Sequence, residues 1–175
     1  TTRVRSKGRA RGPDFTCFQE PFNETLNALN VPARYDRLLG AQEGSVLRHP
    51  PLDMPYFYEF WTRRERLAGL YRNEFAYRQY FMDEAGRLPP AQIAYVSALI
   101  GLADGRPVLQ FCRSSGRVGA LRREFGGTHV HVWREPRNQW WSYKVADYFE
   151  RVTQLIYRSE LLPQALCEIR SMAGI

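Results

Sequence analysis

The chain has 175 residues, of which 44% are hydrophobic and 14% aromatic, and its formal net charge is +7. This composition excludes an intrinsically disordered chain, and the length favours one domain over two. The positive charge favours an anionic partner: a nucleotide, an acidic glycan or a nucleic acid. The three cysteines are far apart, which argues against a disulfide framework or zinc site and favours a cytoplasmic location. No apolar run approaches the roughly 20 residues that a membrane span requires.

The first half of the chain predicts one strand and several helical segments. Residues 1–13 form a basic N-terminal arm with a cationic residue at every second position. A short strand is expected over Phe15–Phe18, followed by a helix that Asn23 caps. Residues 30–55 are rich in proline, glycine and turn residues, which predicts an irregular connection. An apolar stripe over residues 56–81 predicts a helix with a packing face.

The second half of the chain alternates between predicted helices and strands. Helices are expected over residues 91–102, 114–125, 138–157 and 163–172, and strands over 107–111 and 128–133. Pro89-Pro90 starts the first of these helices, and Gly126-Gly127 stops the second. Strands that alternate with helices at this spacing predict a parallel sheet. The expected fold class is therefore α/β, a parallel sheet flanked by helices in a single domain over 14–175, with a helical insert at about 50–105.

The segment from His129 to Tyr143 carries the strongest functional signal. It predicts a β-branched strand that ends at Arg134, a turn that contains Pro136, and a helix that carries Ser142. Ligands in open α/β sheets bind outside the carboxyl ends of the strands. An arginine fork and a serine hydroxyl at that edge suit a phosphate group. His129 and His131 share a face of the predicted strand, but no third ligand accompanies them, so no metal site is predicted.

The pattern of Arg134-x-Pro-Arg137 followed five residues later by Ser142 resembles the 3′-phosphate-binding segment of PAPS-dependent sulfotransferases of the bacterial carbohydrate type. PAPS is 3′-phosphoadenosine 5′-phosphosulfate. The resemblance implies a P-loop nucleotide-binding fold in which Arg134 and Ser142 hold the 3′-phosphate of PAPS. Three tryptophans, Trp133, Trp140 and Trp141, flank this segment. They are expected either to pack in the core or to stack on the ligand, with core packing favoured.

The segment Cys17-Phe-Gln-Glu-Pro-Phe-Asn23 is similar to the family strand that ends in a Glu-Pro pair near the acceptor hydroxyl. By this resemblance Glu20 is the catalytic base that accepts the proton of the hydroxyl. Burial against Phe18 and Phe22 would raise the pKa of this carboxyl and so suit it to the role. Glu24 and His49 remain open as alternatives for the base.

The family also has a loop that binds the 5′-phosphosulfate, and this chain departs from it. The candidate ahead of Glu20 is Arg5-Ser6-Lys7-Gly8-Arg9, in which Lys7 and Arg9 would approach the sulfuryl group. Too few residues separate it from Glu20 for the family's helix, so the loop is either missing or degenerate. A second loop opens the predicted helix at residue 114. Its Arg113 and Ser114 could contact phosphate, although such a serine is more often only a helix N-cap.

The sequence therefore predicts a sulfotransferase that moves the sulfuryl group of PAPS to a hydroxyl of a carbohydrate or small-molecule acceptor, without a metal. Two other functions remain open. The first is an inactive sulfotransferase-like binding domain, which the incomplete phosphate loop would explain. The second is a nucleic-acid-binding module that uses the basic arm and the arginine-rich segment 56–81. A nucleic acid is the less favoured partner because glutamates interrupt that segment.

Overall fold

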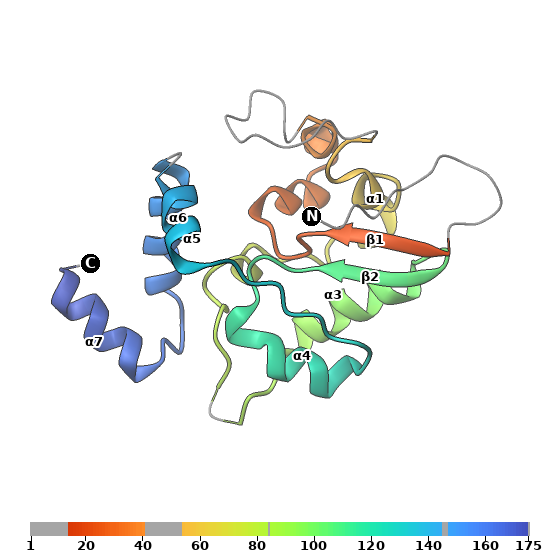
Figure 1. The fold of residues 1–175 in the computed structure, drawn as a ribbon. Helices are drawn as coiled ribbons and strands as arrows, with labels where there is room; N and C mark the ends of the chain where they lie inside the picture. The colour runs from red at the N-terminus through yellow and green to blue at the C-terminus, as the bar shows by residue number, and fades with distance from the viewer. Residues whose placement is uncertain (1–13, 41–53, 84, 145–146, 175) are drawn as a thin grey trace.

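The computed structural model describes residues 14–40, 54–83, 85–144 and 147–174 (Figure 1). Helices dominate it, and short 3₁₀ helices are labelled η. The elements in chain order are β1 (Phe15–Gln19), η1 (Glu24–Asn30), η2 (Pro32–Leu38), α1 (Tyr58–Trp61), α2 (Arg64–Leu67), η3 (Asn73–Phe75), α3 (Pro90–Gly101), β2 (Arg106–Gln110), η4 (Ser115–Arg117), α4 (Val118–Phe125), α5 (Pro136–Tyr143), α6 (Asp147–Tyr157) and α7 (Gln164–Ala173).

The sheet consists of β1 and β2, which pair in parallel within the described residues. The register runs from Phe15 opposite Arg106 to Gln19 opposite Gln110. Both strands end on the side of the molecule where α5 and α6 lie (Figure 1). The expected combination of helices with a parallel sheet is therefore confirmed, in a mixed, helix-rich fold whose sheet is small.

A core rich in aromatic rings packs against β1 and holds the fold together. Phe18 lies edge-on to Phe60 with ring centroids 5.3 Å apart, and Phe22 lies 5.0 Å from Phe111. Each fully buried phenylalanine stabilises the fold by about 1.5–3 kcal/mol relative to an exposed one. The buried members are Phe18, Phe22, Leu26, Ala28, Leu29, Leu38, Phe57, Phe60, Leu67, Tyr71, Phe75, Tyr95, Val96, Leu99 and Leu102. Residues 54–83, the larger described part of the predicted insert, thus pack in the same core as β1.

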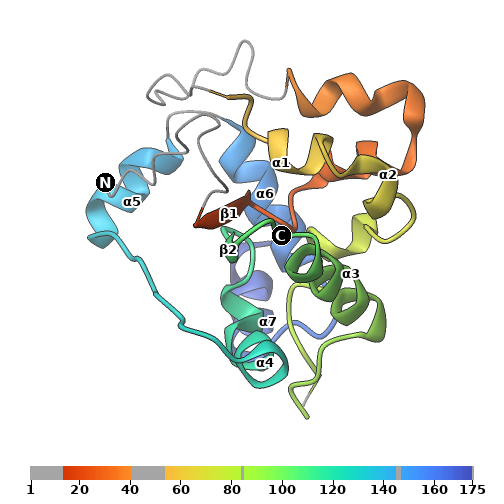
Figure 2. The same ribbon diagram turned by 90° about the vertical axis from the view of Figure 1, so that its right-hand side faces the viewer.

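The predicted strand over residues 128–133 is wrong. The segment is a connection without regular structure that leads from α4 to α5 (Figures 1 and 2), and Val130 and Val132 are 80% and 84% exposed. Its alternating β-branched residues suit a strand, but a strand exists only when a neighbour satisfies its backbone groups. In the described residues β2 pairs with β1 instead.

Two predicted helices are broken into pieces. The apolar stripe over 56–81 forms α1, α2 and η3. Gly69, between α2 and η3, adopts a φ of 76° that no right-handed helix contains. The helix expected over 138–157 is two helices, α5 and α6. The irregular connection expected after residue 30 contains η2 before residues 41–53, which lie outside the described ranges.

The elements with strong local signals are confirmed. β1, β2, α3 and α7 lie within one residue of their predicted ends, and α4 begins after the single turn η4. Gly126 and Gly127 take φ values of 61° and 82° and end α4 as expected. None of the helices in the described ranges is both long enough and apolar enough to cross a lipid bilayer.

Candidate functional site

Glu20 follows β1 directly and has an unusual backbone. Its φ is 45°, a left-handed conformation that costs a residue other than glycine about 1–2 kcal/mol. The proline at position 21 further disfavours helical backbone angles at Glu20. Two main-chain hydrogen bonds hold the turn: Glu20 N–H donates to Gln110 O at 2.8 Å, and Asn23 N–H donates to Glu20 O at 2.9 Å. The backbone is thus strained at Glu20, the first residue after β1.

Three donors fix the Glu20 carboxylate. Asn23 Nδ2 and Arg113 Nη1 donate to Oε2 at 2.7 and 2.5 Å, and the Tyr56 hydroxyl donates to Oε1 at 2.9 Å. Burial, followed by the charge of Glu20, raises the pKa of Tyr56, so this phenol keeps its proton and remains a donor. The sequence predicts that Phe18 and Phe22 bury the Glu20 carboxyl. Phe18 and Phe22 are buried in the core, while the carboxylate is surrounded by polar groups.

Arg113 lies beside Glu20 because the two parallel strands end at the same edge of the sheet. It follows β2 by three residues, is 8% exposed, and also forms an ion pair with Glu24 through Nη2 at 3.1 Å. Burial lowers the pKa of Arg113, but Glu24 and Glu20 outweigh this effect, so the pKa is raised and the guanidinium stays charged. One cation thus faces two carboxylates, which leaves an excess negative charge. We call Glu20, Glu24, Arg113, Tyr56 and Tyr148 the carboxylate cluster.

Helix α6 contributes the last member of the carboxylate cluster. Arg113 Nη2 donates to the Tyr148 hydroxyl, which donates in turn to Glu24 Oε1 at 3.1 Å. The Arg113 guanidinium also lies over the Tyr77 ring, 5.6 Å from its centroid. A separate ion pair between Arg78 and Glu160, at 2.6 Å, ties the segment after α6 to the main body. The carboxylate cluster therefore joins four regions that are far apart in the sequence, around residues 20–24, 56, 113 and 148.

A second arginine, Arg117, holds the backbone of Arg113 in place. It is fully buried, and its guanidinium donates to the carbonyl oxygens of Phe75 at 2.8 Å, Gln79 at 3.0 Å and Arg113 at 2.5 Å. The Phe22 ring lies 4.2 Å from the guanidinium carbon. Burial lowers the pKa of Arg117, because three carbonyl groups and an aromatic ring replace water around the guanidinium. Among the described residues, no carboxylate forms an ion pair with it. Arg117 thus fixes the loop that carries Arg113.

Ser114 and Ser115 play different parts in this loop. Ser114 occupies the N-cap position of η4, but its side chain makes no capping hydrogen bond. Its hydroxyl is buried and has no hydrogen-bond partner among the described residues. The Ser115 hydroxyl shares a hydrogen bond of 2.5 Å with Tyr80. The geometry does not favour the predicted contact of Arg113 with phosphate, because its guanidinium already pairs with Glu20 and Glu24.

Arg134 and Ser142 belong to α5 and the segment that leads into it. Arg134 is exposed at the end of the irregular segment, and Ser142 is a residue of α5. Glu135 caps this helix itself: its carboxylate accepts from the backbone N–H groups of Arg137 at 3.1 Å and Asn138 at 2.9 Å. Because these amides are occupied, an anion at this end of α5 would depend on side chains.

The tryptophans around Arg134 are not core residues, so the favoured expectation for them is wrong. Trp133, Trp140 and Trp141 are 72%, 53% and 60% exposed. Trp140 and Trp141 lie edge to face with centroids 4.7 Å apart, and Lys144 lies over the Trp140 ring at 5.5 Å. These faces are available to stack on a ring system.

Several candidate residues lie outside the described part of the chain. These are Lys7, Arg9 and His49. Among the residues that the structure describes, no three histidine, cysteine, aspartate or glutamate side chains gather as a metal site. Sequence reasoning missed Tyr56, Tyr148 and Arg117, because nothing local in the sequence marks a residue whose partner lies tens of positions away. Glu24, which the sequence leaves open as an alternative base, is a member of the carboxylate cluster.

The buried tyrosines make the fold sensitive to alkaline pH. Burial raises the pKa of Tyr95, Tyr71 and Tyr77 above the ordinary value near 10, as it does for Tyr56. Their contribution to stability is therefore complete below pH 10 and is lost as the pH rises further, by up to about 1.4 kcal/mol per pH unit for each group. Arg117 has the opposite effect: because its pKa is lowered in the folded state, its contribution to stability rises as the pH increases above 9.

We therefore expect the free energy of unfolding in urea to fall as the pH rises above 10. Tyr95→Phe removes one titrating group, at the cost of the hydrogen bond from its hydroxyl to Pro21 O at 3.0 Å. The variant should be less stable at pH 8 but should lose stability less steeply above pH 10. Equal slopes for the two proteins would contradict the role of Tyr95.

Comparison with known proteins gives no relative: no family model, no curated protein and no solved structure matches the chain.

Proposed function

We propose that this chain belongs to a PAPS-dependent sulfotransferase with a P-loop-type fold, which transfers a sulfuryl group to a hydroxylated acceptor, such as a carbohydrate. The observation that supports this most is the Glu20 carboxylate, held by three donors at the carboxyl edge of a parallel sheet. Ligands bind at this edge in α/β proteins, and strained backbone is concentrated at functional sites. Both features support the role of Glu20 as the base, which the resemblance of its segment to the sulfotransferase family predicts.

The chemistry assigns one atom to the proton transfer. PAPS supplies an activated sulfuryl group when it is bound. The acceptor oxygen forms a new bond to sulfur while the bond from sulfur to the phosphate oxygen breaks, and the hydroxyl proton passes to Glu20. Oε2 accepts two hydrogen bonds and Oε1 accepts one, from Tyr56. We therefore assign proton acceptance to Oε1, which has more free lone-pair capacity.

The residues around α5 fit the nucleotide end of the donor. Arg134 is exposed, and so are the indoles of Trp133, next to it in the sequence, and of Trp140 and Trp141 on α5. An adenine ring can stack on such indoles, and an arginine fork can bind the 3′-phosphate. The N-terminal amides of α5 are occupied by Glu135, so the phosphate contacts in this proposal come from Arg134 and Ser142. Lys7 and Arg9 remain the candidates for the 5′-phosphosulfate end.

The test is calorimetric binding of 3′-phosphoadenosine 5′-phosphate to the wild type, to Arg134→Ala and to Arg151→Ala, at two salt concentrations. Arg151 is an exposed arginine of α6 and serves as the matched control. We expect micromolar binding that Arg134→Ala weakens about tenfold to a hundredfold, the range for loss of one charge-assisted contact. Glu20→Gln should keep this affinity but slow sulfuryl transfer to a panel of sugars by about a hundredfold or more.

The outcome that would overturn the proposal is the absence of nucleotide binding by the wild type, or an equal loss in the Arg151 variant. A nucleic-acid-binding module would instead bind polynucleotides with an affinity that falls by about a thousandfold between 50 and 200 mM salt. The low-salt and high-salt measurements separate these results. An inactive binding domain would bind the nucleotide with the same dependence on Arg134 but would show no transfer even as wild type.

A further inference from the structure

A hollow on the surface lies between η1 and η2, next to the carboxylate cluster. Its volume is about 670 Å³, and it is lined by Glu24, Thr25, Asn27, Ala28, Arg34, Asp36, Arg37 and Gly40. Every lining residue belongs to the described part of the chain. A space of this size accommodates a ligand of one or two sugar rings.

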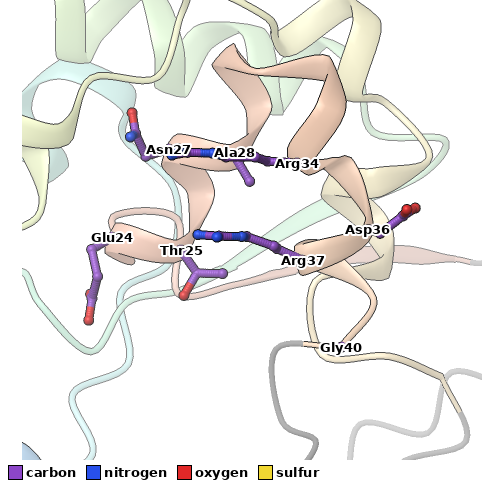
Figure 3. A pocket seen from close by; sticks show the side chains of 8 residues that line it. All are labelled: Glu24, Thr25, Asn27, Ala28, Arg34, Asp36, Arg37 and Gly40. Atoms are coloured by element: carbon purple, nitrogen blue, oxygen red, sulfur yellow. The ribbon is translucent and has the colours of Figure 1, made fainter.

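Two arginines give the hollow its chemical character. Arg34 and Arg37 are three residues apart on η2, and a 3₁₀ helix has three residues per turn, so their side chains lie one above the other. Figure 3 shows both side chains extending in the same direction from η2 across the hollow, Arg37 toward Thr25 and Arg34 toward Ala28. The geometry therefore presents two parallel guanidinium groups to whatever occupies the hollow.

These two cations have no carboxylate to neutralise them within the described residues. Asp36 lies between them in sequence, but its side chain points away (Figure 3), and neither arginine forms an ion pair in those ranges. Glu24 lines the hollow too, yet its carboxylate is engaged by Arg113 and Tyr148. Like charges side by side repel each other, and a shared anion relieves this repulsion.

The remaining polar groups of the hollow suit hydroxyls. Thr25 and Asn27 line the hollow from η1, with Thr25 beside Arg37 and the Asn27 side chain directed away from both arginines (Figure 3). A hydroxyl and an amide both donate and accept hydrogen bonds, as recognition of a sugar requires. Glu24 belongs both to the hollow and to the carboxylate cluster that holds Glu20. The hollow is thus linked to the proposed base through two side chains, since Glu24 pairs with Arg113 and Arg113 pairs with Glu20.

We propose that this hollow binds an acidic acceptor, a hydroxylated compound that carries a carboxylate or sulfate group, and that Arg34 and Arg37 bind this group. The inference deepens the proposed function, on which its description as an acceptor site rests. The binding itself is independent of that function, since it requires neither PAPS nor transfer.

The experiment measures calorimetric binding of four probes to the full chain without nucleotide: a uronic-acid disaccharide, a sulfated neutral disaccharide, the unsubstituted neutral disaccharide and inorganic sulfate. The variant is Arg34→Gln/Arg37→Gln. The control is Arg66→Gln/Arg122→Gln, which removes the same charge from two exposed arginines that line no part of the hollow. Unfolding curves of both variants check that the fold is retained.

We expect at least one acidic disaccharide to bind the wild type and the control equally, and to bind Arg34→Gln/Arg37→Gln about a hundredfold more weakly, about tenfold for each lost contact. The two acidic probes distinguish a carboxylate site from a sulfate site, and inorganic sulfate should compete for it weakly. Affinity for 3′-phosphoadenosine 5′-phosphate should remain unchanged in the variant.

Three results would overturn the proposal. The first is equal binding of the neutral disaccharide, or no binding of any acidic probe by the wild type. The second is an equal loss in the control, which would indicate nonspecific attraction by the net charge. The third is a parallel loss of nucleotide affinity in the variant, which would place the arginines in the nucleotide site. Acidic-sugar binding without any nucleotide binding would support the hollow while rejecting the sulfotransferase.

Discussion

Replacing Arg113 with methionine is expected to lower the free energy of unfolding by about 3 kcal/mol, at the lower end of the range for a broken buried ion pair. The side chain of Glu20 is 19% exposed and that of Glu24 is 34% exposed, so solvent screens part of the loss. The cost arises because two carboxylates lose the cation between them. Urea unfolding at neutral pH measures it, and sulfuryl transfer should fall as well, because Glu20 loses one of its three donors.

Arg122→Met provides the matched control, since Arg122 is an exposed residue of α4 and should lose less than about 0.5 kcal/mol. The double variant Glu20→Gln/Arg113→Met tests whether the two residues act as a pair. Its loss should be smaller than the sum of the single losses by about 1–3 kcal/mol. Strictly additive losses would show that Glu20 and Arg113 do not interact, and the carboxylate cluster would have to be abandoned.

Arg117→Leu is expected to destabilise the protein by about 3 kcal/mol as well, but for a different reason. The guanidinium satisfies the carbonyl oxygens of Phe75, Gln79 and Arg113, and each buried carbonyl left without a donor costs about 1–3 kcal/mol. Removing a buried charge that burial already disfavours offsets part of this loss. Thermal or urea unfolding gives the net value.

Sulfuryl transfer is the second readout for Arg117→Leu, and it distinguishes positioning of Arg113 by Arg117 from a purely structural role of Arg117. We expect Arg117→Leu to reduce sulfuryl transfer more than Arg122→Met, while nucleotide affinity remains that of the wild type, because α5 lies elsewhere in the fold. Arg117→Lys keeps the charge but cannot reach three carbonyls with one planar fork. It should therefore fail to restore stability. Full recovery by lysine would show that the charge alone matters and would contradict the proposed carbonyl contacts.

Much of the local structure could be predicted from the sequence. Pro89-Pro90 marks the start of α3, and Gly126-Gly127 marks the end of α4, because these residues restrict or permit backbone angles wherever they occur. The strand over 128–133 could not be judged in this way. Its alternating pattern is suitable, but pairing depends on a neighbour that the local sequence does not contain.

In the candidate site too, local sequence marks single residues, whereas the contacts between them depend on the tertiary fold. Glu20 and Arg113 each follow a predicted strand. The sequence predicts Glu20 as the catalytic base and Arg113 as a phosphate ligand. Their ion pair depends on the parallel register of β1 with β2, a contact between residues 93 positions apart. No spacing rule links Tyr148 or Tyr56 to them. The pairing that redefines the role of Arg113 is therefore a property of the tertiary fold.

The exposed tryptophans give the protein an optical consequence. Three of the four tryptophans are the exposed residues around Arg134. The fourth, Trp61, stacks on Tyr58 with ring centroids 6.0 Å apart and lies under the Arg64 guanidinium at 4.6 Å. Intrinsic fluorescence should thus be red-shifted and open to quenching by iodide. A nucleotide at α5 would shield most of this emission, whereas a sugar between η1 and η2 would leave it unchanged, so one label-free signal distinguishes occupation of the two sites.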